Sequence, residues 1–347
     1  MPFTVGSVNR RVLTLVVALV PIVAFGLLLS AVTVPFVGLG PGPTFNTLGE
    51  VEGKEVVDIE GTDVHPTSGN LNMTTVSQSD GLSLGQALAL WMSGNEQLVP
   101  RDLVYPPDKS RDDIDKENTA DFKNSEDNAE YAALSYLKYP MAVTVETVTD
   151  PGPSLGKLED GDAIDAVNDT PVATVEEFTK ILKTTKPGDQ LVVDYRRKNK
   201  PAGTTTITLG DNPDRDYGYL GVAVRDAPWA QFTIDFNLAN IGGPSAGLMF
   251  SLAVVDKLTT GDLNGGKFVA GTGTIDGEGN VGPIGGITHK MYAAQEAGAT
   301  VFMVPAENCD EAKSAHDDGL TLIKVENLTG AIDGLKTYSA GGEPPGC

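Results

Sequence analysis

The chain has 347 residues, enough for two or three domains that each bury a core. It carries 25 Lys and Arg against 47 Asp and Glu, and the net charge of -22 argues against general affinity for nucleic acid or anionic lipid. Two Cys and three His supply too few ligands for zinc fingers, iron–sulfur clusters or His-rich metal sites. We therefore expect no metal, no cofactor and no nucleic-acid partner.

The N-terminal region contains an uncharged segment, residues 12–34, long enough as a helix to cross a hydrocarbon core of about 30 Å. Arg10 and Arg11 precede it, and no basic residue follows before Lys54. The positive-inside rule then predicts that residues 1–11 are cytoplasmic and the remainder extracytoplasmic. A cleaved signal peptide is the alternative, but its apolar region would span only about 7 to 15 residues. We predict an uncleaved, single-pass anchor.

The next part of the chain alternates between turn-forming and periodic segments. Residues 35–68 begin with a Pro/Gly-rich stretch and are predicted to be a juxtamembrane connector. A strand is expected over 69–76 and a helix over 82–92. The acidic segment 106–130 is predicted to be a solvated loop or helix start, because it lacks the ordered spacing of a calcium loop. An amphipathic helix is expected over 128–137.

A run typical of one peptide-binding module follows. The sequence LEDGDAIDAVN, at 158–168, lies between a predicted strand at 143–148 and a predicted helix at 175–184. This stretch resembles a PDZ domain over residues 139–210. The resemblance implies an extended peptide between that strand and that helix, with its terminal carboxylate at the loop 139–141. Because this loop lacks the usual Gly-rich pattern and contains a proline without an N–H, carboxylate binding there stays open.

A possible nucleophile follows the predicted strand 232–238. The sequence IGGPSAG delivers Ser245 to the start of an apolar helix that ends at Leu258. Unpaired N–H groups and the helix dipole favour negative charge there, so backbone groups near Gly243 and Ser245 could form an oxyanion hole. The alternative is an ordinary helix whose first turn is capped by a serine.

The residues downstream favour the catalytic interpretation. Residues 267–290 read KFVAGTGTIDGEGNVGPIGGITHK and, together with GGPSAG, resemble the proteolytic domain of the Lon family. The resemblance implies that Ser245 is the nucleophile, Lys290 the general base of a Ser–Lys dyad, and Thr272 a supporting hydroxyl. A lysine serves as a base only if its pKa falls well below 10.4, which we expect from desolvation by apolar neighbours. These neighbours are Ile284, Ile287 and Met291.

Other motifs offer weaker alternatives. His289 adjoins Lys290, but neither it nor His65 or His316 lies in a recognisable Ser–His–Asp motif. The sequence GDLNGGKF departs from a phosphate-binding loop at Phe268, where Ser or Thr would hold magnesium, so we expect no ATP binding. The S-x-x-K sequence at 154–157 lacks its companion motifs and falls in the PDZ-like turn.

The resemblances imply an α+β protein in which a PDZ domain interrupts a Lon-like proteolytic domain. The predicted parts are a cytoplasmic N-terminus 1–11, an anchor 12–34, a connector 35–68, proteolytic segments 69–138 and 231–338, a PDZ domain 139–210, a linker 211–230 and a tail 339–347. This arrangement resembles bacterial membrane-anchored, ATP-independent Lon-like serine proteases. It implies extracytoplasmic or membrane-associated polypeptide substrates and a homo-oligomeric, hexameric ring.

The alternative function is that of a PDZ adaptor that keeps the Lon-like fold only as a scaffold. The two cysteines, Cys309 and Cys347, both fall on the predicted exported side, where disulfides persist, so we predict that they are bonded.

Overall fold

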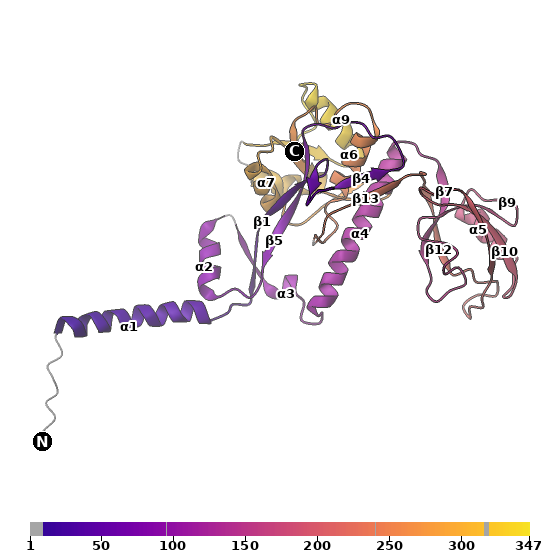
Figure 1. Cartoon of the computed structure of the whole chain (residues 1–347). Coiled ribbons are helices and arrows are strands. Elements are labelled where there is room, and N and C mark those ends of the chain that lie inside the picture. Colours follow the sequence, from indigo (N-terminus) through magenta and orange to yellow (C-terminus); the bar gives the residue numbers. More distant parts are fainter. Residues whose placement is uncertain (1–9, 95, 240, 316–318) are drawn as a thin grey trace, which may run out of the picture.

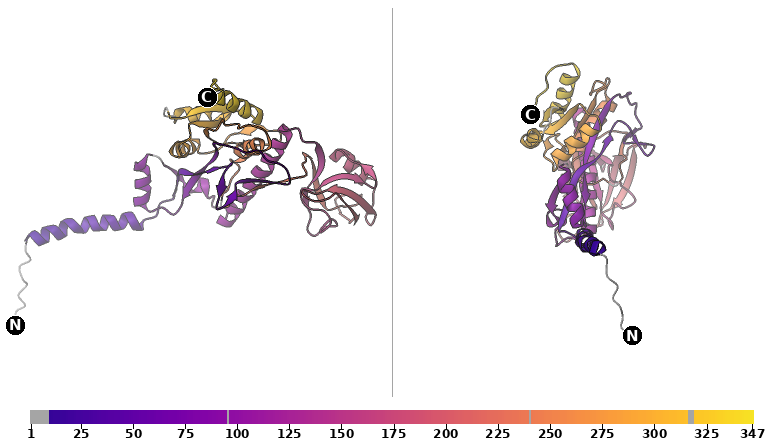
Figure 2. Two further views of the ribbon diagram at one scale, coloured as in Figure 1. Left: turned by 45° about the horizontal axis from the view of Figure 1, so that its top comes forward. Right: turned by 90° about the vertical axis from the view of Figure 1, so that its left-hand side faces the viewer.

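The computed structural model describes residues 10–94, 96–239, 241–315 and 319–347. Figure 1 shows a long N-terminal helix standing away from a mixed α/β domain, with a smaller β-rich domain on the opposite side. The two further views in Figure 2 keep this three-part arrangement. The expected α+β class is therefore confirmed. Within the described residues, helix α1 (Arg10–Ala31) contains one segment, Val12–Ala31, with the length and apolar composition of a membrane span.

The α/β domain is built around a sheet of six strands in the order β18-β17-β14-β5-β1-β6. Strand β14 is parallel to both β5 and β17, and β17 is parallel to β18, whereas β1 is antiparallel to β5 and β6. The strands are β1 (Phe36–Asn46), β5 (Asn70–Ser79), β6 (Gln97–Pro100), β14 (Phe268–Gly271), β17 (Val301–Pro305) and β18 (Thr321–Val325). Strands from both sides of the PDZ-like region thus share one sheet.

The segment 35–68 differs from the predicted connector. It contributes β1, which lies between β5 and the edge strand β6, and β4 (Val57–Glu60) pairs with β13 (Thr233–Phe236). Prolines are usually excluded from central strands because they lack an N–H, and β1 contains two. The pairing of β1 with β5 shifts register between Pro41 and Thr44, so the prolines fall at an irregularity that needs no regular ladder bond.

The acidic segment takes the second of its two predicted forms, a helix start. It joins the helix predicted over 128–137 in one helix, α4 (Arg111–Tyr136). Ser110 caps it in a capping box with Asp113, and acidic residues in the first turn complement the helix dipole. Further along, Phe122 meets Phe250 edge to face with ring centroids 5.8 Å apart. These contacts seat α4 on the apolar core of the larger domain.

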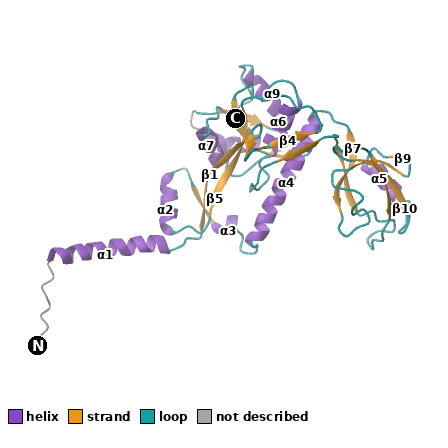
Figure 3. Cartoon of the chain, viewed as in Figure 1, coloured by secondary structure: helices purple, strands orange, loops and turns teal. Residues whose placement is uncertain are grey.

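Helix α6 (Gly247–Leu258) forms the centre of that core and is buried along nearly its whole length. Helices on all sides of the sheet complete the domain, as Figure 3 shows. They are α2 (Leu84–Ser93), α3 (Arg101–Val104), α7 (Ile287–Glu296), the 3₁₀ helix η1 (Ala306–Asn308), α8 (Cys309–Ser314) and α9 (Leu328–Ser339). Short strand pairs are β2 (Glu50–Val51) with β3 (Lys54–Glu55), and β15 (Thr274–Ile275) with β16 (Val281–Gly282).

The smaller domain has its own sheet, in the order β11-β10-β8-β7-β12, and its own apolar core. Its elements are β7 (Met141–Val148), β8 (Ala163–Val167), β9 (Thr170–Pro171), α5 (Val175–Leu182), β10 (Gln190–Arg196), β11 (Gly203–Thr208) and β12 (Val222–Pro228). Strand β12 lies in the segment predicted as a linker. The domain therefore extends well past residue 210.

The C-terminal tail is fixed rather than free. Cys309 and Cys347 form a disulfide with their Cα atoms 5.3 Å apart, which confirms the predicted pairing. The Lys324 N–H also donates to the Pro345 carbonyl over 2.8 Å. The residues predicted as a tail are thus held against the last strand of the sheet.

Asp256, on α6, is fully buried, and its Oδ2 atom has no hydrogen-bond partner among the described residues, while Oδ1 accepts from the Leu263 N–H. Burial raises the pKa of this carboxyl to about 6. Since the folded pKa exceeds the unfolded value, the folded state binds the extra proton, and stability falls as pH rises through this range. Asp256→Asn removes that dependence. The free energy of unfolding of the variant minus that of the parent measures this effect. We expect this difference to be about 2 kcal/mol more positive at pH 7.5 than at pH 4.5.

Denaturant titrations followed by circular dichroism at the two pH values measure this difference. Comparing the variant with the parent at each pH cancels the other titrating groups and the constant cost of burying the amide. A difference that does not change between pH 4.5 and 7.5 would contradict the raised pKa.

Candidate active site

Ser245 lies in the turn that leads into α6. The turn needs glycine at Gly243, where φ is 86°. The Ser245 carbonyl accepts hydrogen bonds from the Gly273 N–H over 3.0 Å and from the Thr272 hydroxyl over 3.1 Å. The segment after β14 therefore fixes the backbone of the predicted nucleophile.

Lys290 reaches the same place from α7. Gly286 precedes this helix in a left-handed conformation, with φ at 70°, and a Cβ atom there would lie 2.9 Å from Val76 Cγ2. This close approach brings α7 against β5. The Lys290 side chain then donates from Nζ to Ser245 Oγ over 2.8 Å and to Thr272 Oγ1 over 3.0 Å. The three residues singled out from the sequence meet at one point.

Burial tunes the lysine for proton transfer. Lys290 is only 3% exposed, and desolvation lowers the pKa of its amine to about 8. Ile287 and Met291, on the same helix, are buried, and Ile284 is partly buried beside them. A neutral amine is a proton acceptor, so this environment lets a lysine act as a general base near neutral pH.

The dyad opens onto a cavity of about 620 Å³. Ser245 and Lys290 line it, whereas Thr272 is fully buried behind them. Apolar side chains form much of the remaining wall: Met73, Val76, Phe122, Ile241 and Ile284. The cavity is large enough to take a polypeptide side chain next to the Ser245 hydroxyl.

The Gly243 N–H has another partner. It donates to the Asn118 carbonyl on α4 over 3.0 Å, and a Cβ atom at Gly242 would lie 2.9 Å from Asn118 Cβ. In this arrangement the Gly243 N–H is therefore not available to an oxyanion. The sequence could not reveal this contact, because Asn118 lies in an acidic helix far away along the chain.

The alternative catalytic groups lie elsewhere. His289 is buried and lines a different pocket, with Tyr292 and Leu320, while His65 is in the loop between β4 and β5. His316 lies outside the described residues. The GDLNGGKF sequence leads into strand β14 rather than a helix. Among the residues that the structure describes, no group of three or more His, Cys, Asp or Glu is placed to hold a metal ion.

In the smaller domain, the edge strand beside α5 is not the strand at 143–148 that was predicted to pair with a peptide. Strand β7 is paired on both sides, with β8 and β12, so it cannot accept a further strand. The edge strand beside α5 is β12, and the Val175 N–H of α5 donates to Asp226 Oδ1 over 2.8 Å. The Gly-rich sequence GYLG, at 218–221, comes directly before β12. A Gly-rich candidate for the loop predicted at 139–141 thus lies at the end of the domain, where the GYLGVAV pattern could have indicated it.

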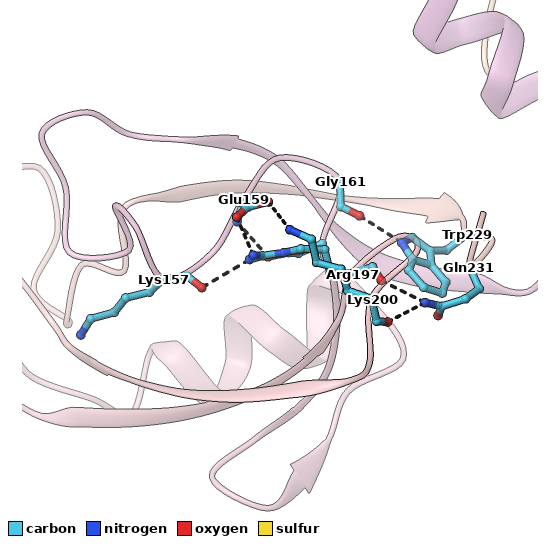
Figure 4. Close-up of polar contacts among 8 residues, drawn as sticks. Lys157, Glu159, Gly161, Arg197, Lys200, Trp229 and Gln231 are labelled. Carbon is cyan, nitrogen blue, oxygen red and sulfur yellow. Dashed lines mark hydrogen bonds and ion pairs between the residues drawn. The ribbon is translucent and has the colours of Figure 1, made fainter. Parts of the chain in front are cut away.

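The smaller domain is fixed to the larger one through its β10–β11 hairpin. Gln231 donates from Nε2 to the carbonyls of Arg197 and Lys200, while Trp229 donates from Nε1 to the Gly161 carbonyl within the smaller domain (Figure 4). At the hairpin tip, Asn199 donates from Nδ2 to Thr233 Oγ1 over 3.0 Å. Side-chain hydrogen bonds therefore join the two domains, in addition to the two chain segments that lead into and out of the smaller domain.

Comparisons with known proteins agree with this geometry. Residues 240–336 match the family described as Lon protease (S16) C-terminal proteolytic domain, and residues 118–208 match the PDZ domain. A Lon protease from Heliobacterium modesticaldum is 44% identical over 93 residues, which cover 26% of this chain and 11% of that protein. An archaeal Lon protease from Halobacterium salinarum is 30% identical over 95 residues, covering 27% and 13%. The chain thus spans only a small part of the curated relatives it matches.

Among solved structures, the PDZ domain of an SdrC-like protein from Listeria monocytogenes is 22% identical, with a TM-score of 0.23, and the match covers 24% of this chain and 86% of that domain. The family match over residues 240–336 shows that the chain carries a proteolytic domain of the Lon type. It also carries a PDZ domain, whose matched segment ends before β12.

Proposed function

We propose that the protein is a membrane-anchored serine endopeptidase that uses Ser245 and Lys290 as a catalytic dyad and works without ATP. The observation that carries the proposal is the 2.8 Å contact between Lys290 Nζ and Ser245 Oγ, made by a buried lysine with a lowered pKa. The substrates are extracytoplasmic or membrane-associated polypeptides, and the PDZ domain governs their access.

The chemistry follows from the two contacts of Lys290. The neutral amine accepts the Ser245 hydroxyl proton while Oγ attacks the scissile carbonyl. The protonated amine then donates to the leaving nitrogen, the C–N bond breaks, and an acyl-enzyme remains on Ser245. Water attacks the ester with the amine again acting as base, which releases the acid and restores the serine. Thr272 acts as a positioning residue, since its hydroxyl holds Nζ 3.0 Å away.

The oxyanion of each tetrahedral intermediate belongs at the start of α6, where backbone N–H groups have no partner within the helix. We assign the Ser245 N–H to this role. The Gly243 N–H joins it only after leaving the Asn118 carbonyl, so substrate binding would have to move the turn away from α4.

The anchor and the assembly are parts of the same proposal. Helix α1 crosses the cell membrane once, with the catalytic and PDZ domains outside the cytoplasm, as the Arg10–Arg11 pair indicates. The working form is a homo-oligomeric, hexameric ring. Protease accessibility in right-side-out and inverted vesicles tests the orientation, and light scattering of the detergent-solubilised protein tests the assembly.

A PDZ adaptor without catalysis is the second candidate function, favoured by the edge strand β12 and its Gly-rich loop. A fluorescent boronate or fluorophosphonate separates the two. Labelling of the parent protein that is lost in Ser245→Ala supports the enzyme. Equal labelling of both, or none under any condition, supports the adaptor.

The lowered pKa of Lys290 predicts the pH dependence of peptide hydrolysis. Only the neutral amine accepts the serine proton, so kcat/KM should rise about tenfold per pH unit below pH 7 and level off above pH 8. An unshifted lysine would instead give a rise that continues to about pH 10. Initial rates on a short fluorogenic peptide between pH 6 and 10 measure the profile, and circular dichroism at each pH controls for unfolding.

A further inference from the structure

Helix α2 exposes an apolar face that its own domain does not cover. Leu88, Trp91 and Met92 are 41%, 70% and 74% exposed. Their spacing places them on one side of the helix. The side that carries Leu90 packs on the sheet, since Leu90 Cδ1 lies 2.8 Å from the position a Cβ would take at Gly38, and Ala87 is buried next to it. Helix α2 carries no charged residue.

This face lies where the N-terminal helix ends. Leu84 donates its N–H to the Val32 carbonyl over 2.7 Å, and Val34 donates to the Leu82 carbonyl over 2.9 Å. A Cβ atom at Gly85 would lie 3.2 Å from the Leu29 carbonyl oxygen, so the two helices touch directly. Figures 1 and 2 show α2 lying crosswise at the C-terminal end of α1 rather than continuing its direction.

From this placement, we infer that α2 lies on the membrane and inserts Leu88, Trp91 and Met92 into the leaflet where α1 ends. The inference rests on the proposed membrane span. If α1 spans the bilayer, a helix that runs crosswise to α1 at its C-terminal end lies along the bilayer surface. Tryptophan is enriched at that depth because its ring is apolar and its N–H is polar. The patch is continuous with α1, whose apolar segment Val12–Ala31 is not buried by the protein.

Charges around the exit point suit the headgroup region. Arg101 and Arg111 both pair with Asp80, so the trio keeps one net positive charge in a chain that is otherwise strongly acidic. Arg111 is 63% exposed along its side chain. The Arg101 N–H donates to the Pro35 carbonyl over 3.0 Å, which places this cluster beside the exit of α1. Lipid phosphates are acceptors for such guanidinium groups.

Attachment at α2 as well as α1 would hold the proteolytic domain at a fixed height above the bilayer. The dyad cavity would then face polypeptides that emerge from or lie along the membrane. The anchor alone would leave the domain free to swing.

The chain has two tryptophans, and only one of them is placed to meet lipid. Trp229 is 4% exposed in the smaller domain, so tryptophan quenching by bromine on lipid chains reports on Trp91. The full chain is reconstituted in phosphatidylcholine vesicles with and without brominated acyl chains, as the parent and as Trp91→Phe. We expect the brominated lipid to quench the parent and to leave Trp91→Phe unaffected. Trp91 is outside the catalytic machinery, so peptide hydrolysis by Trp91→Phe should match the parent and show that it is folded.

Alkaline carbonate extraction of the same vesicles tests α1 separately. Protein that resists extraction but shows no Trp91 quenching would overturn the α2 inference and leave the anchor standing. Protein released by carbonate would overturn both. Trp91 emission that changes with protein-to-lipid ratio and ignores bromine would assign the patch to a second copy of the chain, which also overturns the inference.

Discussion

Ser245→Ala and Lys290→Ala are each expected to abolish peptide hydrolysis, and the double variant should be little worse than either. Removing the general base alone should lower kcat by about 10²- to 10⁴-fold. Because the amine has no role without the hydroxyl it deprotonates, the two losses cannot add. Lys290→Arg should fail as well, since a guanidinium stays protonated at any usable pH and cannot accept the serine proton. Single-turnover and steady-state rates on a fluorogenic peptide measure the four variants.

His289→Gln is a matched control, because His289 is next in sequence and also buried but faces another pocket. It should keep most of the activity. A folded Lys290→Arg variant with near-normal turnover would reject the lysine as base. Loss of activity in His289→Gln, with its fold preserved, would point to an imidazole instead.

The three residues that meet at the candidate site could be singled out from the sequence because each lies inside a short, contiguous motif. The turn before Ser245, the hydroxyl of Thr272 and the helix of Lys290 are local features, and one sheet brings them together. The burial that lowers the lysine pKa could also be anticipated from the apolar residues spaced around it. The Asn118 contact could not, since it joins a helix and a turn that are far apart in sequence.

The misassigned segments share a physical cause. Strand β1 contains Pro41 and Pro43, whose low strand propensity argues against a strand. The pairing of β1 with β5 and β6 outweighs this local preference, and a sequence pattern does not show such pairing. Strand β12 falls in the predicted linker 211–230, beyond the end of the PDZ-like pattern at residue 210. Edge and interior strands differ in their neighbours rather than in their composition, so sequence patterns alone do not separate β7 from β12.

A second large effect, on the cleavage of protein substrates, is expected from a substitution beside the edge strand β12 of the PDZ domain. Ile181, on α5, and Val222 and Val224, on β12, are partly buried around the core of this domain. An extended peptide that pairs with β12 would lay alternate side chains against them. Ile181→Asp should therefore lower kcat/KM for unfolded protein substrates on the order of tenfold, the equivalent of about 1.4 kcal/mol of lost binding. Hydrolysis of short peptides, which reach the dyad without the PDZ domain, should not change.

Lys180→Asp is the matched control, because it puts the same charge on an exposed position of the same helix. It should leave both substrate classes unaffected. Equal losses of protein and peptide hydrolysis in Ile181→Asp would indicate that the domain unfolds and disturbs α4 through its hairpin. Unchanged cleavage of both classes in a folded Ile181→Asp variant would show that substrates bypass β12. The hairpin tip contacts Thr233 in the β4–β13 pair, and we expect this contact to couple peptide capture at β12 to the dyad cavity. This coupling is why the loss should appear in kcat/KM for long chains only.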